Sequence, residues 1–311
     1  MSNATDQVLP SDPRTVCVIG GSGFLGARIA RAFAVGGHRV VVVARQPDRV
    51  PADLRGDRFT ARKADIGDAE ALRRALEAAD IVVNAVSLYT ERGSATFRSI
   101  HVEGAARLAQ TARRAGVEAL VHISGIGASR QARDPYCRAR GEGEDAVRHA
   151  FPGAVILRPS AMFAAEGGFL HTLSELVRTM PVLPLFGRGT TRLQPVHADD
   201  VAKAAVCAAL RRDLHGQVHF AAGPTIYTYR ELLDLIIRQS GSRTILMPYP
   251  FTLWHATAAI AERLPGAPVT RAQVALMEHD NVAGQSGIFA ACGIERQGVE
   301  STIRAITAAR R

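Results

Sequence analysis

The sequence predicts an α/β protein in which a doubly wound parallel sheet carries a smaller, mostly helical C-terminal lobe. In the first half of the chain, short apolar runs alternate with helical patterns, which is typical of parallel strands joined by right-handed crossovers. A glycine-rich turn joins the first run to the first helix. Of the 311 residues, 47% are hydrophobic and 22% are charged, so the chain is able to bury a sizeable core.

Six apolar runs of the first half are expected to form strands. They are Thr15–Ile19, Arg39–Val43, Arg58–Ala64, Ile81–Asn84, Ala119–Ile123 and Ala154–Leu157. The patterns between these runs predict helices at Phe24–Val35, Ala69–Ala78, Ser94–Ala115 and Tyr136–His149. Asp68 stands directly before the second of these helices and is expected to cap it.

The second half of the chain is less regular. Its helices are expected at Gly168–Thr179, Asp199–Leu210, Thr228–Gln239, Phe251–Leu264 and Val269–Asp280. One strand is expected at Gln217–Phe220, and loops with a short strand over Pro181–Pro184 and Gly187–Pro195. Asp199 or Asp200 is expected to cap its helix, and Thr228 and Glu231 have the spacing of a capping box.

The strongest motif is the run Gly20-Gly21-Ser22-Gly23-Phe24-Leu25-Gly26, which follows the first strand and opens the first helix. Gly20 permits the tight turn, Gly23 lets backbone approach a pyrophosphate, and Gly26 lets the helix pack on the strand. The amides at the helix start then point at the phosphates. This context predicts dinucleotide binding, with Gly20, Ser22, Gly23, Phe24, Leu25 and Gly26 as contacts. The alternative is a tight turn that holds no ligand.

The end of the second strand indicates which dinucleotide is bound. NAD sites place an Asp or Glu about 20 residues beyond the turn, on the ribose 2′-hydroxyl. Here the chain reads Val43-Ala44-Arg45-Gln46, without a carboxylate. Because a guanidinium pairs well with a 2′-phosphate, Arg45 favours NADP(H), and NAD(H) remains possible. The alternative is a solvent-facing arginine in an arginine-rich protein.

Other expected cofactor contacts follow later strands. Asp65 and Ile66 would frame the adenine, although Asp65 is equally suited to cap a loop. Asn84 and Val86 lie where the backbone passes under the cofactor, although Asn84 would also serve to tie down neighbouring loops. Pro159 would shape the backbone near the nicotinamide.

These features divide the chain into four parts. Residues 1–13 are expected to form a loose tail, and 14–160 a Rossmann domain that binds NAD(P). Residues 161–192 and 226–311 are expected to form a small substrate or partner lobe. The segment 193–225 is expected to return to the Rossmann domain.

Over nearly its whole length the chain resembles the short-chain dehydrogenase/reductase superfamily, of the extended or atypical type. In that superfamily a Ser after the fifth strand precedes a helix that carries Tyr-x-x-x-Lys. The resemblance implies that Ser124 orients a substrate carbonyl and that Tyr136, as a phenolate, acts as the acid or base. Arg140 stands four residues beyond Tyr136, where the superfamily has its lysine, which lowers the tyrosine pKa and holds the nicotinamide ribose.

This substitution bears directly on function. Positions four apart share a helix face, so Tyr136 and Arg140 are both expected to reach one ribose. Arg140 keeps the positive charge that favours a phenolate, but its guanidinium is a wider, planar fork than an ammonium. Either the site turns over, or Ser124 and Tyr136 line a cofactor pocket without turnover.

Several further motifs resemble the NADPH-binding accessory subunit of mitochondrial complex I and its bacterial relatives. They are Tyr136–Glu144, Leu157–Ser160, Pro184–Gly187, Gln194–Val196 with Asp200-Val201, Tyr227–Leu232, Leu264–Gly266, Val269–Arg271 and Asp280–Val282. That resemblance implies a tightly held, structural dinucleotide, and some relatives are associated with ubiquinone metabolism. We therefore expect an accessory or stabilising factor of complex I or of quinone metabolism. An active NAD(P)H-dependent reductase, dehydrogenase or epimerase is the alternative, and a redox sensor is a third hypothesis.

Charge and composition restrict the partners further. The net charge is +9, but the basic residues are spread along the chain, so nucleic acid is not an expected partner. The same charge would favour contact with an anionic membrane surface. No run is long enough to span a bilayer, and no signal peptide is expected. The segment Pro250–Leu264 is a candidate interfacial helix, or else an ordinary helix that covers the lobe.

The four cysteines, Cys17, Cys137, Cys207 and Cys292, are scattered and predict neither a disulfide nor a zinc site. A cytoplasmic location follows, with peripheral contact at the inner face of a membrane as a further option. His197 beside Asp199 and Asp200 lacks the spacing of a metal cluster, so no metal site is predicted.

Overall fold

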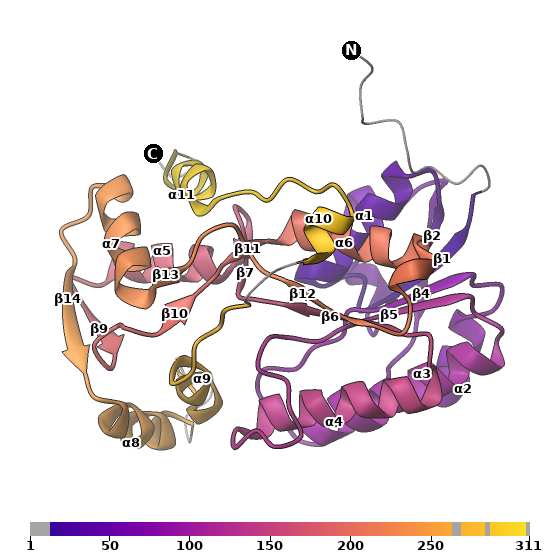
Figure 1. Ribbon diagram of the computed structural model, residues 1–311, viewed down its shortest axis with the longest axis horizontal. Helices are drawn as coiled ribbons and strands as arrows, with labels where there is room; N and C mark the ends of the chain where they lie inside the picture. Colours follow the sequence, from indigo (N-terminus) through magenta and orange to yellow (C-terminus); the bar gives the residue numbers. More distant parts are fainter. Residues whose placement is uncertain (1–12, 263–268, 284–286, 309–311) are drawn as a thin grey trace, which may run out of the picture.

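The computed structural model describes residues 13–262, 269–283 and 287–308. Its centre is a parallel seven-stranded sheet in the order β12-β6-β5-β4-β1-β2-β3 (Figure 1). The strands are β1 (Thr15–Ile19), β2 (Arg39–Ala44), β3 (Phe59–Lys63), β4 (Ile81–Asn84), β5 (Ala119–Ile123), β6 (Val155–Pro159) and β12 (Val218–Ala221). The chain reverses its direction of winding between β1 and β4, which is where open α/β sheets bind their ligands. The predicted fold class is confirmed.

Helices cover both faces of this sheet (Figure 1). On one face lie α1 (Phe24–Val35) and α6 (Ala198–Leu210), and on the other α2 (Ala69–Ala75), α3 (Ala105–Arg114) and α4 (Pro135–Ala150). Alternate residues of β1 enter the two cores, with Val16 and Val18 in one and Cys17 and Ile19 in the other. Burial on both faces explains why the strands read as continuous apolar runs.

One expected helix is divided in two. In place of a single helix over Ser94–Ala115, the chain forms a π-helical stretch at Arg98–Gly104 that continues into α3. This stretch packs closely on α4, because a Cβ added to Gly143 would lie 1.9 Å from the His101 carbonyl oxygen. The His101 backbone thus lies against the middle of α4, and its ring meets Tyr136 at the start of that helix.

The small lobe has its own core of leucine and isoleucine side chains. Around it lie α5 (Phe169–Thr179), α7 (Tyr229–Ser240), α11 (Val299–Ala308) and the parallel pair β9 (Val182–Phe186) and β14 (Ile245–Tyr249). Helices α8 (Phe251–Ala261) and α9 (Arg271–Met277) extend towards α4 (Figure 1). Short strands β7 (Met162–Ala164), β8 (Gly167–Gly168), β10 (Arg192–Leu193), β11 (Val196–His197) and β13 (Tyr227–Thr228) connect the two parts.

Three expectations fall outside the described residues, wholly or in part. They are the tail over residues 1–12, the last two residues, 263–264, of the helix that becomes α8, and the motif Leu264–Gly266. Within the described residues, no helix is long and apolar enough to cross a membrane.

The expected cap of α6 is wrong. The helix begins at Ala198, and the His197 ring accepts a hydrogen bond from the Asp199 amide at 3.3 Å. Asp199 and Asp200 therefore lie inside the first turn rather than before it. Asp200 is completely buried and accepts the Gln297 amide at 2.8 Å, so it holds the C-terminal segment instead. The caps expected at Asp68 and at Thr228 with Glu231 are confirmed.

The cysteine prediction also needs correction. Cys207 on α6 forms a disulfide with Cys292, 85 residues away, while Cys17 and Cys137 are free and buried. The bond is possible because α10 (Gly287–Ala291), within the range expected for the small lobe, packs on β12 and α6. The positions of the cysteines in the sequence do not reveal that α10 packs back onto the sheet domain. The disulfide removes the basis for inferring a reducing compartment.

Candidate functional site

The glycine-rich turn has the geometry that its sequence predicts. Gly20 has a φ of +78°, a conformation that side chains with a Cβ rarely adopt. Helix α1 crosses the turn closely, because a Cβ added to Gly26 would lie 2.2 Å from the Gly20 carbonyl oxygen. Any larger residue at Gly26 would push the start of the helix away from β1.

The start of α1 is open to an anionic ligand. Its cap residue is Gly23, no side chain caps it, and its first turn has no acidic residue. The first turn of any helix leaves several N–H groups without partners in the helix. Helices α2, α4 and α7, in contrast, are capped by Asp68, Asp134 and Thr228. The turn therefore fits the diphosphate of a dinucleotide, with the helix dipole adding to the attraction.

The residues expected around the rest of the dinucleotide lie at the carboxyl ends of the strands. Arg45 is exposed directly after β2, and Asp65 is exposed two residues after β3. The Asp65 carboxylate accepts the Gly67 amide at 2.7 Å, while Ile66 is buried. Arg45 is thus available to a ligand, and Asp65 also serves its own loop.

Asn84 ends β4 and is almost completely buried. Its oxygen accepts the Val86 amide at 3.2 Å, and its nitrogen lies 3.0 Å from Nδ1 of His122. Asn84 therefore fixes the backbone beside the turn, which was one of its two expected roles. Pro159 ends β6 and is also buried.

The structure brings Tyr136 and Arg140 together at the start of α4. Arg140 donates to the Tyr136 hydroxyl from Nε at 3.2 Å and from Nη2 at 3.1 Å. It also donates to the Ile123 carbonyl at 2.8 Å and to the Ser87 hydroxyl at 2.7 Å. One guanidinium therefore joins the end of β5, the loop after β4 and the tyrosine.

Aromatic side chains surround the Tyr136 ring. Tyr89 stacks on it at 5.5 Å, while Phe97 and His101 meet it edge-on at 5.6 and 5.5 Å. Burial raises the pKa of Tyr136 to about 12, although the charge of Arg140 opposes this. Burial therefore favours the neutral phenol of Tyr136, while the charge of Arg140 favours the phenolate expected from the superfamily.

The charge of Arg140 is buried among neutral hydrogen-bond acceptors. The side chain is 3% exposed, and its hydrogen bonds to the described residues all go to neutral oxygens. Burial, followed by the charge of Arg140, lowers the pKa of both His101 and His122 to about 3. Both imidazoles are therefore neutral and do not repel the buried cation.

Ser124 faces a different partner. Its hydroxyl donates to Oε1 of Glu144 at 2.5 Å, one helical turn beyond Arg140. Glu144 is 1% exposed, and Arg158 holds it through two further hydrogen bonds at 2.9 and 2.6 Å. The expected trio is therefore divided into two groups, Tyr136 with Arg140 and Ser124 with Glu144.

Four residues at this site were missed by the sequence analysis. Ser87 and Tyr89 lie in the loop after β4, and Glu144 and Arg158 lie beyond the residues that the superfamily resemblance assigned. Glu144 shares a helix face with Tyr136 and Arg140, since they are four and eight positions apart. Helical spacing was the signal that would have found it.

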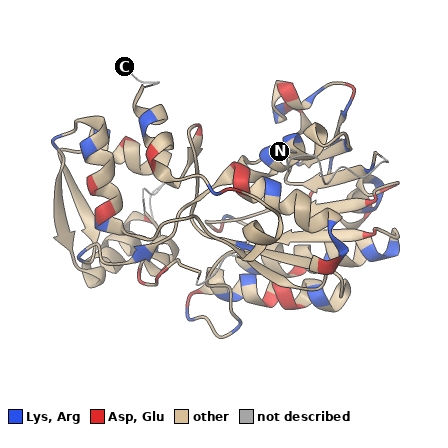
Figure 2. Ribbon diagram, turned by 45° about the horizontal axis from the view of Figure 1, so that its top comes forward, with Lys and Arg blue, Asp and Glu red and all other residues tan. Residues whose placement is uncertain are grey.

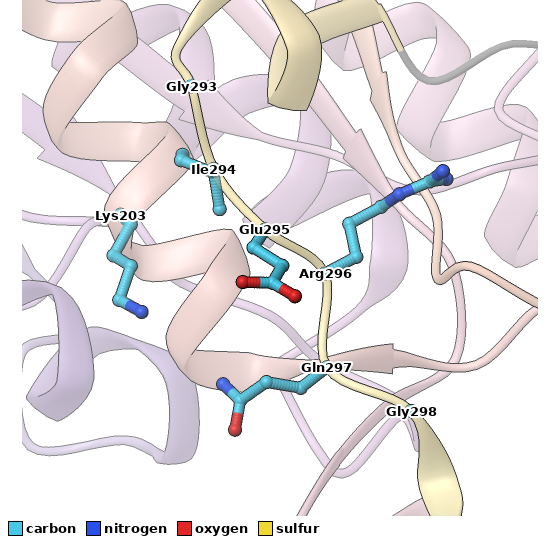
Figure 3. Close-up of a pocket in the computed structure, with 7 residues that line it drawn as sticks. All are labelled: Lys203, Gly293, Ile294, Glu295, Arg296, Gln297 and Gly298. Carbon is cyan, nitrogen blue, oxygen red and sulfur yellow. The ribbon is translucent and has the colours of Figure 1, made fainter. Parts of the chain in front are cut away.

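A surface pocket lies outside this site. It has a volume of about 530 Å³ and is lined by Lys203 of α6 and by the segment 293–298 (Figure 3). None of the residues that line it belongs to the glycine-rich turn or to the Tyr136 group. Among the described residues, no cluster of His, Cys, Asp and Glu is arranged to hold a metal.

Known proteins with similar sequences include complex I subunits and a reductase. The chain is 31% identical over 242 residues to the alpha subcomplex subunit 9 of mitochondrial NADH dehydrogenase (ubiquinone) from Arabidopsis thaliana, covering 75% of this chain and 60% of that protein. It is 30% identical to a ceramide reductase from Caulobacter vibrioides, covering 76% of this chain and 73% of that protein. The chain thus spans about three fifths of the plant relative. The expected resemblance to complex I accessory subunits is confirmed.

Solved structures share the fold at low sequence identity. An NADPH-dependent quinone oxidoreductase from Escherichia coli, complexed with NADPH, has a TM-score of 0.75 at 18% identity, covering 93% of this chain and 98% of that one. A UDP-glucose 4-epimerase from Thermus thermophilus, in complex with NAD, has a TM-score of 0.70 at 19% identity, covering 94% and 98%. The model of the NAD dependent epimerase/dehydratase family matches residues 16–223. The chain belongs to the NAD dependent epimerase/dehydratase family.

Proposed function

We propose that this chain holds NADP(H) as a fixed structural element and acts as an accessory or stabilising factor linked to respiratory complex I or ubiquinone metabolism. The bond between Ser124 and Glu144 carries this proposal. A hydroxyl has one proton to donate, and Ser124 donates it to Glu144. It has none left for a substrate carbonyl, which weakens the catalytic arrangement but leaves the binding turn intact.

The preference for NADP(H) over NAD(H) rests on Arg45. It is exposed directly after β2, where NAD-specific sites place a carboxylate on the ribose 2′-hydroxyl. A guanidinium at that position pairs with a 2′-phosphate through charge-assisted hydrogen bonds. Gly20, Ser22, Gly23, Phe24, Leu25 and Gly26 would hold the diphosphate, while Asp65, Ile66, Asn84, Val86, Tyr136, Arg140 and Pro159 would line the rest of the nucleotide.

Complex I or a quinone-pathway protein is the proposed partner, because relatives carry the name of a complex I subunit. A cytoplasmic location, peripheral at the inner face of the membrane, follows from that partner. The Cys207–Cys292 disulfide does not fit a permanently reducing compartment. Counting the thiols of freshly purified protein tests the location, because only Cys17 and Cys137 react if the disulfide is present and all four cysteines react if it is not.

Retention of nucleotide tests the proposed function. We expect protein purified through gel filtration to release about one NADP(H) per chain on denaturation, and not to oxidise added NADPH with quinones or simple carbonyls. The variant Arg45→Ala should lose NADPH affinity about tenfold or more and leave NADH affinity unchanged. Arg39→Ala, exposed at the opposite end of β2, is the matched control. Equal losses for the two nucleotides would contradict the 2′-phosphate contact.

An active reductase is the second candidate function, and the contact between Arg140 and Tyr136 favours it. The nicotinamide of a bound NADPH would supply a hydride. Tyr136, protonated at neutral pH because its pKa is raised to about 12, would give its proton to a carbonyl oxygen. The N–H groups of Arg140 would then stabilise the phenolate that remains. The named ceramide reductase among the relatives supports this alternative.

In that reaction Ser87 would replace Ser124 as the hydroxyl that orients the carbonyl. Ser87 accepts from Arg140 and also hydrogen-bonds with the Tyr136 hydroxyl, so it lies directly beside the proposed acid. Turnover that falls at least about a hundredfold in Tyr136→Phe, falls in Ser87→Ala and survives in Ser124→Ala would establish the reductase. An unchanged rate in Tyr136→Phe would exclude Tyr136 as the acid.

A further inference from the structure

Helix α8 has an apolar composition that the fold does not bury. Its eleven residues, FTLWHATAAIA, include no Lys, Arg, Asp or Glu. Helices that are apolar on all sides are normally enclosed by protein or by lipid. Here only Ala258 is fully buried, while Leu253 and Ile260 are 48% and 64% exposed. Leu253, Ala256, Thr257 and Ile260 form one exposed stripe, because they are three, four and seven positions apart.

The pair β9 and β14 continues this apolar surface. Residues of a strand alternate between its two faces, and Leu183 and Leu185 of β9 point into the core of the small lobe. On the opposite face, Val182 pairs in register with Ile245, and both are exposed, at 40% and 66%. Met247, on the same face of β14, is 47% exposed.

Trp254 joins the helix to this face. Its ring stacks on Phe186 at 4.5 Å and meets Tyr249 edge-on at 5.2 Å. Phe186 and Tyr249 alternate onto the same face as Val182 and Ile245. Helix α8 therefore covers the Phe186 end of that face, and Val182, Ile245 and Met247 stay exposed beyond it. We call these exposed side chains the apolar rim: Val182, Ile245, Met247, Leu253 and Ile260.

Two arginines without an ion pair among the described residues border the apolar rim. Arg243 stands two residues before Ile245, and Arg188 follows β9 by two residues, next to Gly187, which lies against the Phe251 ring. Both arginines are exposed, and neither forms an ion pair with the residues that the structure describes. Figure 2 shows β14 and α8 free of charged residues of either sign. Glu262, two residues beyond Ile260, is paired with Arg271, and Glu175, seven residues before Val182, is paired with Arg178.

We propose that the apolar rim docks on the surface of a phospholipid bilayer that contains anionic lipids. Apolar side chains that enter the boundary between headgroups and acyl chains, bordered by arginines that meet anionic headgroups, are the combination that such a surface selects. The net charge of +9 adds long-range attraction. The inference refines the peripheral membrane location proposed above by assigning it to these residues.

Docking there would place the candidate site next to the bilayer. Helix α9 packs beside α8, and its Ala272 and Leu276 contact the aromatic cluster of Phe97 and Tyr136. A lipid-soluble molecule that leaves the bilayer beside α8 would therefore be near Tyr136.

Flotation of the full chain, loaded with NADPH, with lipid vesicles tests the proposal. We expect the protein to float with vesicles that contain roughly one third phosphatidylglycerol, and far less with pure phosphatidylcholine. Leu253→Gln with Ile260→Gln should reduce vesicle binding about tenfold. Val35→Gln, which replaces an 86% exposed valine on the sheet domain, should leave it unchanged. Arg188→Gln and Arg243→Gln should each weaken binding about fivefold, and Arg39→Gln should not.

Retained NADPH is measured on every sample, so that a failure of vesicle binding is separated from a failure of nucleotide binding. If the α8 double variant does not fold, Met247→Gln on β14 tests the same rim. Wild-type protein that stays with the soluble fraction beside anionic vesicles would overturn the proposal. So would equal flotation of wild type and the rim variants, or self-association through the rim in place of vesicle binding.

Discussion

The glycine-rich turn and the start of α4 lie at the same edge of the sheet but use their polar groups in opposite ways. At the turn, the start of α1 has no side-chain cap and no acidic residue, so its amides remain open to a ligand. At α4, Ser124, Tyr136, Arg140 and Glu144 form hydrogen bonds with one another or with neighbours. The difference indicates a molecule in which nucleotide binding is kept while the groups for proton transfer are tied into the structure.

The largest effect is expected at the turn. Gly26→Ala adds a methyl group whose carbon would lie 2.2 Å from the Gly20 carbonyl oxygen, and the atoms it would meet are all backbone, which cannot rotate away. We expect loss of NADPH retention and a loss of unfolding free energy of about 3 kcal/mol. Gly287→Ala, at a glycine whose Cβ position has no described residue within 4 Å, is the control for thermal denaturation and nucleotide release. A Gly26→Ala protein that retains NADPH would show that the turn is not the binding element.

A second large effect is expected at Glu144. Removing this buried carboxylate in Glu144→Ala leaves Arg158 and Ser124 without their partner, which should cost about 3 kcal/mol in urea unfolding. Glu142→Ala, on the same helix, removes a partly exposed pair with Arg98 at 3.7 Å and should cost less than about 1 kcal/mol. Similar losses for both variants would show that the Ser124 group is not fixed as the structure indicates.

A smaller effect is expected from the titration of Tyr136. Its pKa is raised to about 12 in the folded protein, against about 10 in the unfolded chain. The folded state therefore binds more protons between these values, and stability that is complete below pH 10 is lost as the pH rises towards 12. Comparing wild type with Tyr136→Phe isolates this contribution from the other buried tyrosines. An identical pH dependence in the two proteins would contradict the buried, protonated hydroxyl.

The sheet and the turn were predictable because their signals are local. The bounds of β1, α1, β4 and β5 agree with the sequence expectation, since each is set by an apolar run or a glycine within a few residues. The pair Tyr136 and Arg140 was predictable for the same reason, being one helical turn apart.

Long-range contacts were not predictable in this way. Ser87 reaches Arg140 across 53 residues, and Cys207 meets Cys292 across 85. Glu144 takes the Ser124 hydroxyl only because α4 packs against the end of β5. Such pairings depend on how the elements pack, which spacing alone does not reveal, although helical spacing does place Glu144 on the same face as Tyr136 and Arg140. The resemblance to reductases assigned Ser124 a role without showing that its proton is already used.

The most direct test is a crystal structure of the protein grown with NADPH. We expect the diphosphate on the amides between Ser22 and Leu25, with the 2′-phosphate beside Arg45 and the Ser124 hydroxyl still bonded to Glu144. A turn that is blocked by protein atoms in the crystal, or a nucleotide bound elsewhere on the chain, would contradict the assignment of this edge of the sheet as the binding site.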